Sequence, residues 1–169
     1  MFEVRTHPVD HADKPAFYAE VAEQARALLH GERDRVANAA NLSALIWMLL
    51  PDLNWAGFYF SAPAADGVGQ ELVVGPFQGK PACVRIALGK GVCGTAAVTR
   101  QTQVIADVHA FPGHIACDAA SNAEIVVPLV RGDELLGVLD LDSPVHGRFD
   151  ADDRAGLEAL ARIWVESLG

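Results

Sequence analysis

Two apolar segments in the last third of the chain limit the folds that it can adopt. The segments EIVVPLV (124–130) and ELLGVLDLD (134–142) read as β-strands, and only the turn RGD separates them. Strands joined by so short a turn pair antiparallel, because a parallel pair needs a crossover connection of a dozen or more residues. The sequence therefore predicts an antiparallel hairpin and argues against a doubly wound parallel sheet.

Helical patterns at both ends of the chain complete the expected fold. Residues 15–30 and 32–50 carry apolar positions at helical spacing, and residues 150–168 predict a closing helix with Asp150 as its N-cap. Shorter elements lie between them, namely strands at 54–60, 71–77, 83–88 and 103–107 and a helix at 93–100. This order predicts a single α+β domain in which N- and C-terminal helices flank a central, mostly antiparallel sheet.

Length and charge narrow the class of protein. The chain has 169 residues, 51% of them hydrophobic, which suffices for one domain with a real core. No apolar run reaches the ~18 residues of a membrane span, and the N-terminal stretch MFEVRTHPVDHADKP does not predict a secretory signal. A net charge of −9 argues against nucleic acid as a partner and is compatible with a cationic or zwitterionic small ligand.

The three cysteines, Cys83, Cys93 and Cys117, fall within one 35-residue window and have Gly, Pro, His and Asp as neighbours. These neighbours are typical of turns and exposed loops. An odd number of cysteines without a secretory signal predicts a cytoplasmic protein, in which disulfides are transient and catalytic. We therefore expect thiol redox chemistry.

The segment 107–123 lacks periodicity, and an irregular stretch of this length in a small domain is typical of a functional loop. In it, His109, His114 and Cys117 have the spacing H-x4-H-x2-C, which could form a zinc site with another cysteine. No C-x2-C pair supports zinc. The alternative is that the Pro-Gly turn in this segment directs Cys117 into a pocket.

The hexapeptide GKGVCG (89–94) matches the G-x-G-x-x-G pattern of dinucleotide-binding proteins, and Asp107 ends the next strand. The short helix that follows and the later hairpin argue against that fold. The alternative is a tight turn that places Cys93 near a helix N-terminus, where its thiol pKa could fall.

Asp140 and Asp142 lie two residues apart on a predicted strand and so share one face. They are either a solvated strand end or an anionic pocket for an ammonium group. Whether Glu124 joins them depends on the hairpin register. A two-residue loop at 132–133 pairs Glu124 with Leu141 on the wrong face, whereas a one-residue shift or bulge places it opposite Asp142.

Trp55 and Tyr59 are four residues apart on a predicted strand and also share a face. They are either core residues or the apolar wall of a ligand site.

Five segments resemble, in their order, the free methionine-(R)-sulfoxide reductases, which are small single-domain members of the GAF fold. The segments are NWAGFYF, GPFQGKPAC, GKGVCGTAA, FPGHIACDAASNAEIVVPL and GVLDLDSP. The resemblance extends from residue 16 to 169 and leaves residues 1–15 as an N-terminal extension. Ala123, where members often have Ser, and the variable loop 61–70 depart from the pattern without touching the cysteines or the acids.

The resemblance implies a role for each candidate residue. Cys117 is implied to be the catalytic thiol, Cys83 to form a disulfide with it, and Cys93 to be a secondary partner. Glu124, Asp140 and Asp142 are implied to hold the substrate's amine and sulfoxide. Trp55 and Tyr59 are implied to pack on its methyl group and side chain.

The implied reaction converts free methionine (R)-sulfoxide to methionine through a sulfenic acid and an intramolecular disulfide, which thioredoxin reduces. The resemblance implies neither a metal nor a bound cofactor. Two alternatives remain, a GAF-type sensor of a small ligand and a nicotinamide enzyme that uses GKGVCG. The oligomeric state, monomer or homodimer, is left open.

Overall fold

A six-stranded antiparallel sheet organises this computed structural model, which describes residues 2–6, 11–115 and 117–169. The strand order is β3-β2-β1-β6-β5-β4, and each neighbouring pair is antiparallel. The strands are β1 (Trp55–Pro63), β2 (Gln70–Gly79), β3 (Arg85–Ala87), β4 (Gln103–Ile105), β5 (Ala123–Arg131) and β6 (Glu134–Ser143). The predicted hairpin is formed by β5 and β6, which confirms the expected α+β class.

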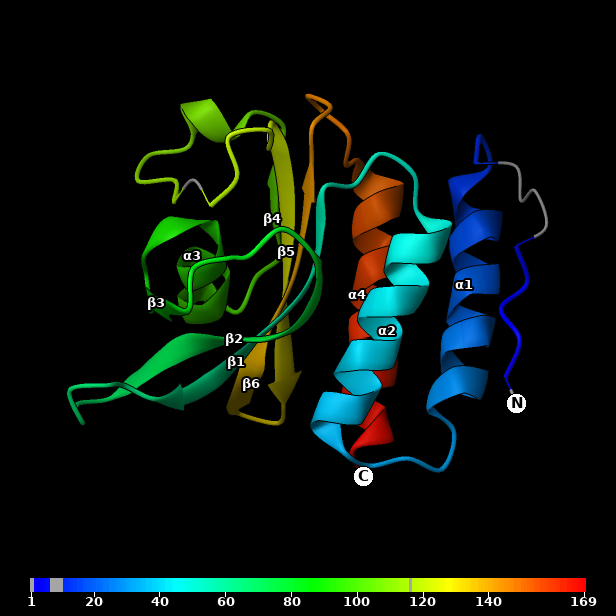
Figure 1. Cartoon of the computed structure of the whole chain (residues 1–169), viewed down its shortest axis with the longest axis horizontal. Helices are drawn as coiled ribbons and strands as arrows, with labels where there is room; N and C mark the ends of the chain where they lie inside the picture. Colours follow the sequence, from blue (N-terminus) through cyan, green and yellow to red (C-terminus); the bar gives the residue numbers. More distant parts are fainter. Residues whose placement is uncertain (1, 7–10, 116) are drawn as a thin grey trace.

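Three helices, α1 (Lys14–Leu29), α2 (Arg35–Leu49) and α4 (Ala151–Ser167), cover one face of the sheet, as Figure 1 shows. The short helix α3 (Gly91–Thr99) lies on the other face with the irregular loops. Asp150 is the N-cap of α4, and its carboxylate accepts hydrogen bonds from the backbone of Asp152 and Asp153. None of the described helices combines the length and apolar character that a membrane crossing requires.

Strand alternation divides the core into two layers. Phe58, Leu139 and Leu141 face the three helices and pack with buried Trp164 of α4. The intervening positions of the same strands face α3, where a smaller cluster lies. Asp140 and Asp142 occupy this second face, so these two acids lie on the opposite side of the sheet from the main core.

A bulge settles the register of the β5–β6 hairpin. The turn has two residues, since Arg131 pairs with Glu134, but the register shifts by one between Leu129 and Val130. As a result Glu124 lies opposite Asp142 on the α3 side of the sheet. The alternative with a bulge is therefore confirmed, and the pairing of Glu124 with Leu141 is wrong.

Several boundaries differ from the expected ones. The first hairpin continues to Pro63 and resumes at Gln70, because Ser61 and Ala62 pair with β2 despite their loop-like composition. Within the predicted irregular segment, the described residues 107–115 and 117–122 contain one 3-10 turn, Val108–Ala110, and are otherwise irregular. Of the predicted extension 1–15, residues 1 and 7–10 lie outside the described part of the chain. The backbone of Arg5 forms two hydrogen bonds with the Gln24 side chain of α1.

Candidate active site

A small cavity of about 40 Å³ lies on the α3 side of the sheet. Its walls come from the sheet, the start of α3, the segment after β2 and the irregular loop. The lining includes Trp55, Lys80, Lys90, Cys93, His114, Cys117, Asp118, Ser121, Glu124, Asp140 and Asp142. Most of the predicted site residues are thus brought together at one place.

The three predicted acids form the acidic part of this lining. Glu124 and Asp140 are each 6% exposed, and Asp142 is also largely buried. Burial raises the pKa of all three carboxyls well above their usual range, and the charges of their acidic neighbours raise it further. Both effects favour the protonated, uncharged forms of these carboxyls. The reading of a solvated strand end is therefore wrong.

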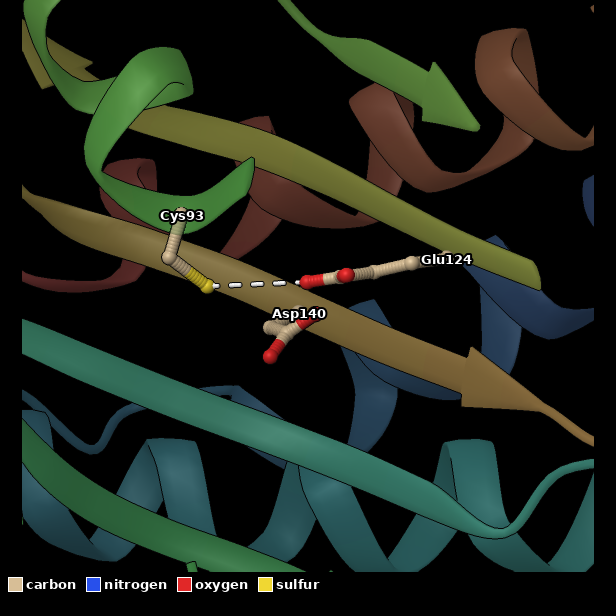
Figure 2. A group of neighbouring side chains, drawn as sticks. All are labelled: Cys93, Glu124 and Asp140. Atoms are coloured by element: carbon tan, nitrogen blue, oxygen red, sulfur yellow. Dashed lines mark hydrogen bonds between the residues drawn. The ribbon is translucent and has the colours of Figure 1, made fainter. Parts of the chain in front are cut away.

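Cys93 joins this cluster from α3, as Figure 2 shows. Its Sγ lies 3.9 Å from Glu124 Oε1 and donates a weak hydrogen bond to it. Burial, followed by the charges of Asp140 and Glu124, raises the pKa of the Cys93 thiol. The suggestion that a helix N-terminus lowers this pKa is therefore wrong, because desolvation outweighs the helix dipole here.

A disulfide joins Cys83 and Cys117, whose Cα atoms lie 6.1 Å apart. Cys117 is exposed at the rim of the cavity, and Cys83 is half-buried on the segment after β2. This pairing agrees with the one that the resemblance implied, and it leaves Cys93 as a buried free thiol.

The two predicted aromatics support this disulfide. The Trp55 ring stacks on Tyr59, with centroids 5.7 Å apart, and its indole N–H donates to the carbonyl oxygen of Lys80. The Tyr59 hydroxyl donates to the carbonyl oxygen of Cys83 at 3.0 Å. Trp55 lines the cavity, whereas Tyr59 lies behind its wall, 2% exposed. Both rings belong to the smaller core cluster. Tyr59 holds the backbone of Cys83, and Trp55 holds the backbone of Lys80 in the same segment.

His114 contributes to the site in a way that the sequence did not predict. Its Nε2 lies 3.4 Å from Glu124 Oε2, and burial lowers its pKa. The three predicted zinc ligands do not form a ligand group among the described residues. Instead Cys117 is in the disulfide, and His109 contacts Asn122 at 3.1 Å.

A polar clasp that the sequence did not predict holds the irregular loop on the sheet. Asn54 Nδ2 donates to Asp118 Oδ2 and to Ser121 Oγ, at 3.2 and 3.0 Å. Asp118 also accepts from Lys80 Nζ at 3.4 Å. The backbone N–H of Ala120, followed by the Asn54 amide, lowers the pKa of Asp118. Two features of the sequence could have indicated this clasp: Asn54 is a polar residue just before β1, and Asp118 is an acid next to Cys117.

The GKGVCG segment forms the tight turn before α3. Gly91 has φ +61°, and a Cβ on Gly94 would lie 2.6 Å from the carbonyl oxygen of Ala87. The glycines thus allow close packing of α3 on β3. The antiparallel sheet around them is unlike a dinucleotide-binding fold.

The chain is similar to proteins of one known family. The GAF domain family model matches residues 15–163. A free methionine-R-sulfoxide reductase of Escherichia coli is 53% identical over 148 residues, which cover 88% of this chain and 86% of that protein.

Solved structures agree. The structure of a candidate GAF sensor protein from Burkholderia vietnamiensis is 68% identical in sequence and has a TM-score of 0.84. The match covers 91% of this chain and 94% of that chain. One of a free methionine-R-sulfoxide reductase from Neisseria meningitidis, in complex with its substrate, is 40% identical with a TM-score of 0.91. It covers 99% of this chain and 96% of its own.

Proposed function

We propose, from the premise that this chain belongs to the free methionine-R-sulfoxide reductases of the GAF-domain family, that it reduces free methionine (R)-sulfoxide with Cys117 as the nucleophile. One observation carries this proposal. The Cys83–Cys117 disulfide stands at the rim of a cavity that Glu124, Asp140 and Asp142 line. A thiol beside buried acids can combine attack on sulfur with protonation of its oxygen.

The acids supply both recognition and acid catalysis. A free amino acid brings an ammonium group that can pair with one carboxylate. A methionine residue in a polypeptide lacks this ammonium and would leave the buried charge unpaired. Burial raises the pKa of Glu124 and Asp140 and so favours their protonated forms, which can donate a proton to the sulfoxide oxygen.

The redox steps then balance with the chain's own thiols. The Cys117 thiolate attacks the sulfoxide sulfur, the oxygen is transferred to Cys117 as a sulfenic acid, and methionine leaves reduced. The Cys83 thiol next attacks the sulfenic sulfur, forms the disulfide and releases the oxygen as water. An external dithiol reduces the disulfide by exchange and restores both thiols.

The state of the thiols supports this order of events. In the disulfide form Cys117 has no free thiol with which to attack. We therefore expect reduction of the disulfide to precede reaction with the substrate. Thioredoxin is the proposed reductant, since Cys117 is exposed and accessible to an attacking thiolate.

We further propose that the protein acts in the cytoplasm, where dithiol reductants are available. Cys93 is proposed as a secondary disulfide partner. The oligomeric state, monomer or homodimer, does not enter the mechanism.

A GAF-type ligand sensor is the second candidate, because the Burkholderia vietnamiensis relative is described in these terms. Turnover of racemic free methionine sulfoxide with thioredoxin or dithiothreitol separates the two. We expect methionine to form from half of the substrate, and chiral analysis of the remainder to show only the S epimer. A sensor gives no turnover, and equal loss of both epimers contradicts the proposed stereochemistry. A nicotinamide enzyme would need NAD(P)H and no dithiol.

A further inference from the structure

Three side chains at the floor of the cavity combine one thiol with two carboxyls. Cys93 Sγ and one carboxyl oxygen each from Glu124 and Asp140 all lie within 4.8 Å of one another, and the three residues are buried. They come from α3, β5 and β6, and Figure 2 shows them converging on one point. Regular elements hold all three, so the group does not depend on the irregular loop.

Asp140 has an oxygen that lacks a partner. Its Oδ1 is buried and accepts no hydrogen bond from the described residues, although the residue is only 6% exposed and lines the cavity. A buried carboxyl oxygen without a donor carries a desolvation cost that nothing in the fold offsets. This oxygen without a donor indicates that the site can accept a ligand that offers positive charge to Asp140.

The donor atoms suit zinc. A tetrahedral Zn²⁺ ion takes sulfur, imidazole nitrogen and carboxylate oxygen at about 2.0–2.3 Å, which separates neighbouring donors by about 3.5 Å. Cys93 Sγ and Glu124 Oε1 are already 3.9 Å apart. His114 lines the same cavity, with its Nε2 3.4 Å from Glu124 Oε2, but it lies outside this group, so the fourth position of the ion is left to an exogenous ligand such as water. A thiolate in the set disfavours Mg²⁺ and Ca²⁺, which prefer oxygen alone.

We propose that Cys93, Glu124 and Asp140 form a three-ligand Zn²⁺-binding site at the floor of the cavity. Binding forms the Zn–S bond as the Cys93 thiol loses its proton to solvent, and the carboxyls release the proton that they share. The ion would then occupy the position in which the proposed function places the substrate's polar groups. Zinc would therefore inhibit the reductase by excluding its substrate.

The disulfide form of the full-length protein provides a clean test, because Cys93 is then the one remaining thiol of the three. Calorimetric titration with Zn²⁺ should show one equivalent bound. Titration with Co²⁺ should produce a sulfur-to-metal charge-transfer band in the near ultraviolet. Cys93→Ser should abolish this band and weaken Zn²⁺ binding by about 10²-fold or more, and Glu124→Gln should weaken binding comparably. Wild type that binds no Zn²⁺, or binds Co²⁺ without the band, would overturn the proposal.

A matched control separates coordination from general attraction of cations. Asp118 lines the same cavity but lies outside the group, so Asp118→Asn removes an acid of the cavity while every donor atom of the proposed site stays in place. We expect Asp118→Asn to retain wild-type Zn²⁺ affinity, and a loss equal to that of Glu124→Gln would contradict the site. The titrations use no substrate, so their failure and a failure of the reductase assay are separate outcomes.

Discussion

Glu124 of β5 lies directly opposite Asp142 of β6, and the pairing exists because a bulge near the hairpin turn shifts the strands by one residue. Without that shift, Glu124 would face the helical side of the sheet, where the core is apolar. The bulge thus converts two acids on one strand into an acidic cluster built by two strands.

The first prediction concerns the thiols. Cys117→Ser should release no methionine even in a single turnover, because the attacking sulfur is gone. Cys83→Ser should release one equivalent and accumulate a sulfenic acid that a dimedone-type reagent traps, because the resolving thiol is missing. Rapid-quench measurement of methionine distinguishes these outcomes. One full equivalent from Cys117→Ser would show that another residue is the nucleophile.

The second prediction concerns catalysis by the acids. Asp140→Asn and Glu124→Gln keep the shape of each side chain but remove a proton donor or a charge. At least one should lower kcat/KM by about 10²-fold or more. A fall in kcat indicates loss of sulfoxide protonation, and a rise in KM alone indicates loss of an ammonium contact. Near-wild-type kinetics in Glu124→Gln, Asp140→Asn and Asp142→Asn would exclude the proposed acid role.

The third prediction concerns stability and pH. The raised pKa of Asp140 means that the folded protein holds this proton more tightly than the unfolded chain. The stabilisation is complete below the unfolded pKa of about 4 and is lost as the pH rises through the folded pKa. Asp140→Asn should therefore raise the free energy of unfolding at pH 8, because the amide carries no charge that burial would penalise. Urea denaturation should also show a weaker decline above pH 4 than in wild type. An unchanged pH profile would contradict the burial argument.

The fourth prediction separates two roles of Tyr59. Its hydroxyl donates to the carbonyl oxygen of Cys83, and its ring lies behind the cavity wall. Tyr59→Phe should therefore slow formation of the disulfide by several-fold, since one hydrogen bond contributes about 1 kcal/mol. Release of the first methionine and KM should change little. If KM rises while disulfide formation keeps its rate, Tyr59 acts on the substrate.

The fifth prediction concerns the β1–β6 junction. Gly137 has φ +153°, and a Cβ there would lie 2.0 Å from the carbonyl oxygen of Tyr59. Gly137→Ala should lower the free energy of unfolding by about 2 kcal/mol or more through overpacking. Gly132→Ala is the matched control, because Gly132 also has positive φ, +59°, but a Cβ there meets nothing within 4 Å. Equal losses in chemical denaturation would assign the effect to backbone strain alone.

The sequence predicted those features that depend on local pattern. Alternation placed Asp140 and Asp142 on one face of β6 and Leu139 and Leu141 on the other, and the structure confirms both. The capping of α4 by Asp150 was equally local, because the side chain bonds to the next turn of its own chain.

Features that depend on the packing of distant segments were not predictable from the residues. The bulge arises where β6 passes close to the backbone of β1 at Gly137, which no hairpin pattern reveals. The positions of Cys83 and Cys117 depend on irregular segments 34 residues apart in sequence, so only the family resemblance suggested their pairing. The clasp of Asn54 on the loop has no periodic signature for the same reason.

The central position of β6 has a consequence for the time at which the site forms during synthesis. This late strand inserts between β1 and β5 and carries Asp140 and Asp142. All three cysteines emerge from the ribosome before it does. The growing chain therefore presents its thiols before Asp140 and Asp142 are available, and β1 and β5 remain unjoined until β6 is complete. Because α3 packs against both β5 and β6, Cys93 of α3 reaches its buried position only after β6 has been made, and until then its thiol is open to oxidants.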